Sequence, residues 1–91
     1  MALNIIFMGT PNFAVPILKS INDSEHNILA VYTQGAKKKD RGQKINISPV
    51  HELSNRIKLQ VRCPIKFDKK ECDFIKNLRP DVIVVVAYGI L

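Results

Sequence analysis

The sequence is poor in the residues that build metal sites and disulfide-linked folds. It contains no tryptophan and only two cysteines, Cys63 and Cys72, which are separated by eight residues. It holds no CxxC pair and no Cys/His cluster with the spacing of metal ligands, and His26 and His51 stand alone. We therefore expect no metal, and two reduced thiols that are partly buried.

Long apolar segments are also missing. The longest, residues 82–88, is far too short to span a bilayer. The first residues lack the basic region and long apolar core of a signal peptide, and no Arg/Ser-rich import leader is visible. These absences predict a cytoplasmic protein that has no membrane partner.

Acidic residues are scarce as well. There are 14 lysines and arginines against 8 aspartates and glutamates, which gives a formal charge of +6. Such an excess favours an anionic partner such as nucleic acid, although an ordinary basic surface would give the same charge. A chain of 91 residues forms one domain at most, of marginal stability, and a hydrophobic content of 46% excludes wholesale disorder.

Segments with the apolar pattern of strands alternate along the chain with segments that have the apolar pattern of helices. Strands are predicted over residues 3–8, 28–33, 59–61 and 81–87, and helices over residues 12–22, 49–56 and 68–78. This alternation is typical of parallel strands joined by right-handed crossovers, and the run Val-Ile-Val-Val-Val shows no polar alternation. We predict an α/β fold: an incomplete, Rossmann-like parallel sheet of four strands in the order 3-2-1-4, with helices on both faces.

The first two helices have recognisable starts. Asn12 is a reasonable N-cap, and Pro16 is tolerable only in the first turn. Ser48 and Pro49 fit the N-cap and first position of the second helix. The apolar face of the first helix is predicted to hold Ala14, Ile17, Leu18 and Ile21, and that of the third Phe74, Ile75 and Leu78.

A ligand site is expected where the strand order reverses, between the first and fourth strands. The carboxyl ends of these strands are Gly9-Thr10-Pro11 and Tyr88-Gly89. Two glycine-containing turns should therefore line one crevice, although each glycine alone could merely permit a tight strand exit. The first turn has one glycine where a dinucleotide fingerprint needs three, and Pro11 lacks an N–H, so a nucleotide site is disfavoured.

A basic segment, residues 35–48, separates the second strand from the second helix. It carries Lys37, Lys38, Lys39, Arg41 and Lys44, with Asp40 as its one acid. We predict a long exposed loop that hangs beside the crevice and contacts phosphates, with Arg41 foremost. The alternative is a solvated run of charge.

No catalytic group can be assembled from the remaining polar residues. His26 precedes a strand, His51 lies early in a helix, and Asp81 is expected at the amino end of the sheet, away from the crevice. We predict that none of the three takes part in the site. A nucleophile, a base and an orienting group do not come together in these 91 residues.

Four stretches resemble the methionyl-tRNA formyltransferase family. They are Phe7-Met8-Gly9-Thr10-Pro11-Asn12-Phe13-Ala14-Val15-Pro16, Ala30-Val31-Tyr32-Thr33-Gln34, Arg41-Gly42 with Lys44 leading to Ser48-Pro49-Val50, and Val84-Val85-Val86-Ala87-Tyr88-Gly89. The resemblance implies transfer of a formyl group from 10-formyltetrahydrofolate to the amino group of methionyl initiator tRNA. It implies that Tyr88, Gly89 and Ile90 form part of a folate pocket. The expected strand order places Gly9, Thr10 and Pro11 on the other wall of that pocket. The resemblance also implies tRNA contacts by Arg41, Lys37, Lys38, Lys39, Lys44 and Phe13.

Departures from the family pattern qualify this resemblance. Residues 35–40 replace a proline-containing loop, and the family's catalytic asparagine, histidine and aspartate have no counterpart. We therefore expect residues 1–91 to be the N-terminal part of a formyltransferase domain, without catalytic residues or the C-terminal tRNA-binding domain. Alone it should be inactive, and its parent should be a monomer. The alternatives are a fragment of a nucleotide-sugar formyltransferase and a small, non-enzymatic, basic RNA-binding module.

Overall fold

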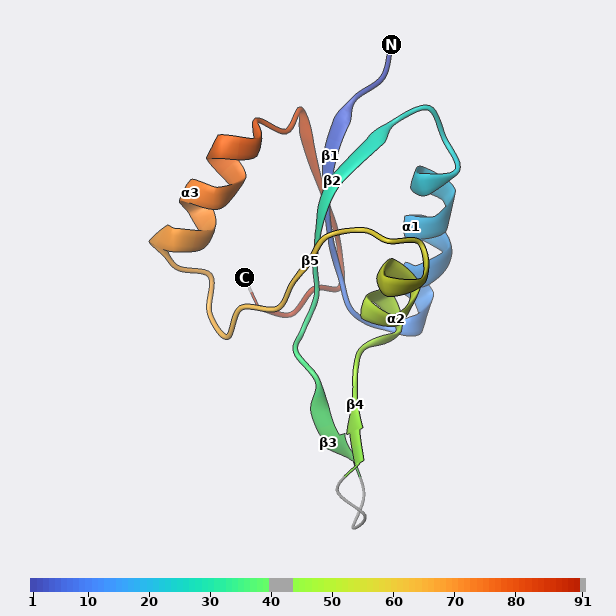
Figure 1. Ribbon diagram of the computed structural model, residues 1–91, viewed down its shortest axis with the longest axis vertical. Coiled ribbons are helices and arrows are strands. Elements are labelled where there is room, and N and C mark those ends of the chain that lie inside the picture. The colour runs from blue at the N-terminus through green and yellow to red at the C-terminus, as the bar shows by residue number, and fades with distance from the viewer. Residues whose placement is uncertain (40–43, 91) are drawn as a thin grey trace.

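A computed structural model describes residues 1–39 and 44–90 of the chain (Figure 1). Strands and helices alternate along the chain as expected, apart from one additional pair of strands. The elements are β1 (Asn4–Gly9), the 3-10 turn η1 (Asn12–Ala14), α1 (Val15–Asn22), β2 (Asn27–Tyr32), β3 (Lys37–Lys39), β4 (Lys44–Asn46), α2 (Pro49–Arg56), β5 (Val61–Arg62), α3 (Lys69–Leu78) and β6 (Val82–Val86).

The main sheet has the order β5-β2-β1-β6, and all of its pairings are parallel. This confirms the predicted order 3-2-1-4. β1 is central because it pairs with β2 on one side, where Phe7 lies opposite Val31, and with β6 on the other, where Phe7 lies opposite Val84. The reversal of strand order therefore falls between β1 and β6, as predicted.

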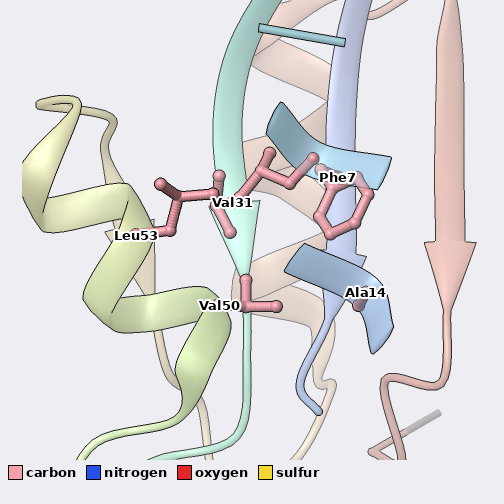
Figure 2. Packing of buried hydrophobic residues seen from close by; sticks show 6 residues of the cluster. Phe7, Ala14, Val31, Val50 and Leu53 are labelled. Atoms are coloured by element: carbon pink, nitrogen blue, oxygen red, sulfur yellow. The ribbon is translucent and has the colours of Figure 1, made fainter. Parts of the chain in front are cut away.

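Helices cover both faces of the sheet, as predicted (Figure 1). Successive residues of a strand point to opposite faces, so Phe7 packs toward α1 and α2 while Ile6 and Met8 pack toward α3. The cluster against α1 and α2 contains Phe7, Ala14, Leu18, Val31, Val50 and Leu53, most of which Figure 2 shows. The cluster against α3 contains Ile6, Met8, Tyr32, Ile75 and Tyr88.

The start of the first helix differs from the prediction in two respects. Asn12 is not an N-cap, because η1 comes first and Ala14 N donates to the carbonyl of Pro11 at 3.0 Å. α1 begins at Val15 without a side-chain cap and has Pro16 in its first turn, as expected. Ile17 is 40% exposed rather than inward-facing, because the helix rotates about 100° from it to the buried Leu18.

The other helices match their predicted starts and faces. Ser48 caps α2, since its Oγ accepts from the backbone N–H of His51 at 3.0 Å, and Pro49 follows as the first helical residue. Phe74, Ile75 and Leu78 of α3 pack against the sheet. Cys63 is half-buried, but Cys72 is exposed, which corrects the expectation for that thiol; α3 turns it away from the sheet.

The basic segment contains regular structure where an irregular loop was predicted. β3 and β4 pair antiparallel in a two-stranded ribbon, named the basic ribbon below, which projects from one end of the sheet (Figure 1). Pairing supplies these strands with backbone hydrogen bonds that an irregular loop would leave to water. Lysine and asparagine, which dominate these two strands, are weak strand formers, so the composition did not indicate a two-stranded ribbon.

β6 forms one edge of the described sheet, as the strand order implied. Its α3 side is open, with Ile83 43% and Val85 50% exposed, whereas Val84 and Val86 pack against the opposite cluster. This side of β6 is open because Phe74, Ile75 and Leu78 of α3 pack against residues of β1 and β2. Among residues 1–39 and 44–90, no helix is long and apolar enough to cross a membrane.

Candidate functional site

The carboxyl ends of β1 and β6 meet in direct contact. Thr10 Oγ1 donates a hydrogen bond of 3.0 Å to the carbonyl oxygen of Tyr88, across 78 positions of sequence. One pairing earlier, Gly9 lies opposite Val86. The two turns singled out from the sequence therefore lie side by side, at the point where the strand order reverses.

A third residue, Gln34, joins the two turns and was missed by sequence reasoning. Its backbone N–H donates to Thr10 Oγ1 at 3.2 Å, and its side-chain Nε2 donates to the Tyr88 carbonyl at 3.1 Å. The carbonyl of Tyr88 thus accepts two hydrogen bonds. We call this set of residues the Thr10–Gln34–Tyr88 junction. The available signal was the position of Gln34, a polar residue just beyond a buried strand.

Both glycines of the turns are required by close packing. A Cβ on Gly9 would lie 2.8 Å from the carbonyl oxygen of Val86 and 2.9 Å from Cε2 of Phe7. Gly89 has φ +94°, and a Cβ there would overlap the side-chain amide of Gln34. Each glycine therefore has a structural explanation, and their predicted contacts with folate remain predictions.

Tyr88 contributes its backbone to the turn and its side chain to the core. The side chain is 1% exposed and its ring lies edge-on to that of Tyr32, with centroids 6.3 Å apart. Burial, with smaller contributions from Cys63 and Glu71, raises the pKa of its hydroxyl to about 12. That hydroxyl has no hydrogen-bond partner among the described residues. The part of the turn that solvent reaches is Ala87 and Gly89, with Ile90 half-buried.

The base of the basic ribbon is held by buried hydroxyl groups. Thr33 Oγ1 and Ser48 Oγ, which flank the ribbon in sequence, lie 2.6 Å apart and are both buried. On the same side, the backbone N–H of Val50 donates to the carbonyl of Thr10 at 3.5 Å. The ribbon therefore leaves the fold next to the junction, as predicted for the basic segment.

The predicted RNA contacts are placed in part. The backbone register pairs Lys37 with Asn46, Lys38 with Ile45, and Lys39 with Lys44. Arg41 and its neighbour Asp40 lie outside the described residues. Phe13 is 63% exposed on η1, three positions after Thr10.

A partly buried ion pair between Arg62 and Glu71 lies beside Tyr32 and was also missed by sequence reasoning. Glu71 Oε1 accepts from Arg62 Nε at 2.7 Å and from the Tyr32 hydroxyl at 2.9 Å, while Arg62 stacks 3.9 Å above the ring of Phe74. The Arg62 hydrogen bonds hold the pKa of Glu71 below its usual range, and burial raises the pKa of Tyr32. These contacts connect α3 to β2 and β5, and they fix the ring of Tyr32, against which the ring of Tyr88 packs edge-on.

The histidines and Asp81 are accounted for by structural contacts. His26 Nδ1 accepts from the backbone N–H of Leu3 at 2.9 Å, and Asp81 Oδ2 accepts from that of Asn4 at 2.8 Å, both at the amino end of the sheet. His51 Nδ1 lies 3.8 Å from Cys63 Sγ. Within the described part of the chain, no three histidine, cysteine, aspartate or glutamate side chains are grouped to hold a metal ion.

Comparison with known proteins gives one consistent result. A family model described as formyl transferase matches residues 3–91. The chain is 48% identical to a methionyl-tRNA formyltransferase of Pelagibacter ubique, over 98% of this chain and 29% of that protein. It is 51% identical to one of Clostridioides difficile and 46% identical to one of Francisella philomiragia, over 96% and 98% of this chain. The chain spans less than a third of the length of these relatives, 28–29%.

Proposed function

This chain belongs to the formyl transferase family, and from that membership we propose that it acts within a cytoplasmic, monomeric methionyl-tRNA formyltransferase. The reaction transfers the formyl group of 10-formyltetrahydrofolate to the amino group of methionyl initiator tRNA. Within it, residues 1–91 form the N-terminal part of the formyltransferase domain. The observation that carries the proposal is the attachment of a basic ribbon, through Gln34, to the turn at Tyr88 and Gly89.

The turn at residues 87–90 is suited to a flat, hydrogen-bonding ring such as the pterin of a folate. Gly89 is exposed and carries no side chain that would keep a ring from the backbone. Among the described residues, the backbone N–H groups of Gly89 and Ile90 make no hydrogen bond, and we propose that they donate to the ligand. When bound, the folate supplies the formyl group. The role of this chain is to hold it against the carboxyl ends of β1 and β6, with Thr10 and Pro11 opposite.

The basic ribbon is suited to RNA phosphates. Its strands hold Lys37, Lys38, Lys39 and Lys44, and the whole chain carries a formal charge of +6. Lysines on a projecting ribbon provide attraction that depends on salt and does not read bases. Arg41 and the exposed ring of Phe13 are proposed as further contacts, Arg41 through a planar guanidinium that suits phosphate.

The two alternatives have less support. The three relatives described above, at 46–51% identity, are all named for methionyl-tRNA rather than for a nucleotide sugar. A non-enzymatic RNA-binding module would not require a formyl transferase match over residues 3–91.

The RNA half of the proposal can be tested by a gel shift with methionyl initiator tRNA across a salt series. We expect binding that weakens steeply with salt, and an Arg41→Ala variant that binds roughly 5- to 10-fold less tightly at 0.1 M salt, the loss expected for one phosphate contact. Arg56→Ala is the matched control, because Arg56 is an exposed arginine on α2. Salt-independent binding, or an equal loss in both variants, would contradict the proposal.

A further inference from the structure

We propose that Gln34 is a positioning residue that couples the basic ribbon to the turn at Tyr88 and Gly89, so that a folate on the turn and RNA on the ribbon strengthen each other's binding. The inference rests on the proposed function for the identity of the two ligands. It goes beyond that function because it assigns a role to a residue that touches neither ligand in the proposal. It is carried by the contacts of the Thr10–Gln34–Tyr88 junction.

Gln34 is fixed at two points that belong to different parts of the site. Its backbone N–H is bound to Thr10 Oγ1 at 3.2 Å, and its side chain reaches 54 positions along the sequence to the Tyr88 carbonyl at 3.1 Å. β3 begins three positions later, at Lys37. A shift of the Tyr88 carbonyl therefore acts on the residue from which the ribbon departs.

The turn and the amide of Gln34 are in close contact at Gly89. The absent Cβ of Gly89 leaves the space that the Gln34 amide fills, and the φ of +94° keeps the backbone turned toward it. A ligand on the exposed backbone of Gly89 is thus one residue from the carbonyl that Gln34 binds. Whatever orders this turn also orders the Gln34 side chain.

The other strand of the ribbon is tied to the same region. Thr33 and Ser48 join the two ends of the ribbon through buried hydroxyls 2.6 Å apart, and Val50 N–H donates to the Thr10 carbonyl. Both ends of the ribbon are therefore anchored to the fold. We infer that the Thr10–Gln34–Tyr88 junction sets the direction in which the ribbon projects. Because ordering one side removes conformational freedom from the other, the linkage should be positive, and it must be reciprocal.

The experiment measures the dissociation constant of uncharged initiator tRNA, by fluorescence anisotropy, with and without saturating 10-formyltetrahydrofolate. The protein used is residues 1–91 joined to the remainder of the Pelagibacter ubique methionyl-tRNA formyltransferase, to which they are 48% identical. In the unaltered chain we expect the folate to tighten RNA binding about 5-fold, the lower end of common allosteric couplings. Gln34→Glu keeps the side-chain size but places an acceptor against the Tyr88 carbonyl. We expect it to reduce the coupling factor to about 1 while each ligand still binds alone. Gln60→Ala, at an exposed glutamine, is the control and should retain the coupling.

The outcomes separate this inference from the proposed function. The inference would be overturned if the two ligands bound the unaltered chain independently, or if the Gln34→Glu variant showed the same coupling. Either result would leave the proposed function standing. Failure of both ligands to bind would remove the proposed function and the inference with it.

If the variant does not fold, amide exchange of the unaltered chain decides instead. Added folate should slow exchange in Lys37–Lys39 and Lys44–Asn46 as well as at residues 88–90, and protection confined to residues 88–90 would contradict the coupling.

Discussion

Replacing Glu71 by alanine is expected to lower the free energy of unfolding by about 3 kcal/mol. The Glu71 side chain is 8% exposed and its two carboxylate oxygens accept three hydrogen bonds, two from Arg62 and one from Tyr32. Removing it leaves a guanidinium and a phenol without their partner beneath the sheet. Because Arg62 keeps 25% of its surface in solvent, we take the lower end of the range for a broken buried pair. Urea unfolding followed by circular dichroism measures the loss.

Two controls identify the cause of this effect. Glu52→Ala removes the same side chain from an exposed pair with Arg56, 65% and 70% exposed, and should cost no more than about 0.5 kcal/mol. The folded state depresses the pKa of Glu71, so its contribution is present above the ordinary carboxyl pKa and is lost as pH falls through the depressed value. The difference between the unaltered chain and Glu71→Ala should therefore shrink below about pH 4. A loss that is equal for the two glutamates, or unchanged in acid, would contradict this account.

Replacing Lys37, Lys39 and Lys44 together by glutamine is expected to weaken binding of methionyl initiator tRNA roughly 100-fold or more at 0.1 M salt. All three residues lie in the strands of the basic ribbon. Each lost phosphate contact removes the release of about one counterion, so the slope of log K against log salt should fall in magnitude by about 2 to 3. Anisotropy titrations at several salt concentrations measure both quantities.

A variant with the same change in net charge provides the comparison. Lys19 and Lys76 are exposed on α1 and α3, and Lys58 is exposed just after α2, so none of the three belongs to the ribbon. Their joint replacement by glutamine should alter affinity only several-fold, through the general field of the protein. Similar losses in the two triple variants would show that net charge, rather than the ribbon, attracts the RNA.

The sheet could be predicted from sequence because its signals are local. The strand that reads Val-Ile-Val-Val-Val, the capping pair Ser48-Pro49 and the apolar face of α3 each act over one element. Right-handed crossovers then restrict the strand order, and 3-2-1-4 is the order of a Rossmann-like sheet. The ribbon was missed because five of its six strand residues are lysine or asparagine, and its strands are supported by pairing rather than by intrinsic preference.

The polar contacts of the site depend on residues that are distant in sequence, so they were harder to foresee. Gln34 binds a carbonyl 54 positions away, which no local pattern encodes. Glu71 did carry a signal. It precedes Phe74, Ile75 and Leu78 by three, four and seven positions, and so places an acid on the buried face of α3. Such a position requires a partner, but nothing in the sequence identified it as Arg62.

The measurement that tests the central claim most directly is formylation by a chimera. Residues 1–91 would replace the equivalent segment of the Pelagibacter ubique methionyl-tRNA formyltransferase, to which they are 48% identical. The account predicts that the purified chimera transfers the formyl group of 10-formyltetrahydrofolate to methionyl initiator tRNA, and that the Lys37, Lys39 and Lys44 replacements abolish most of this transfer at low tRNA concentration. A folded, monodisperse chimera that forms no formylmethionyl-tRNA would contradict the account.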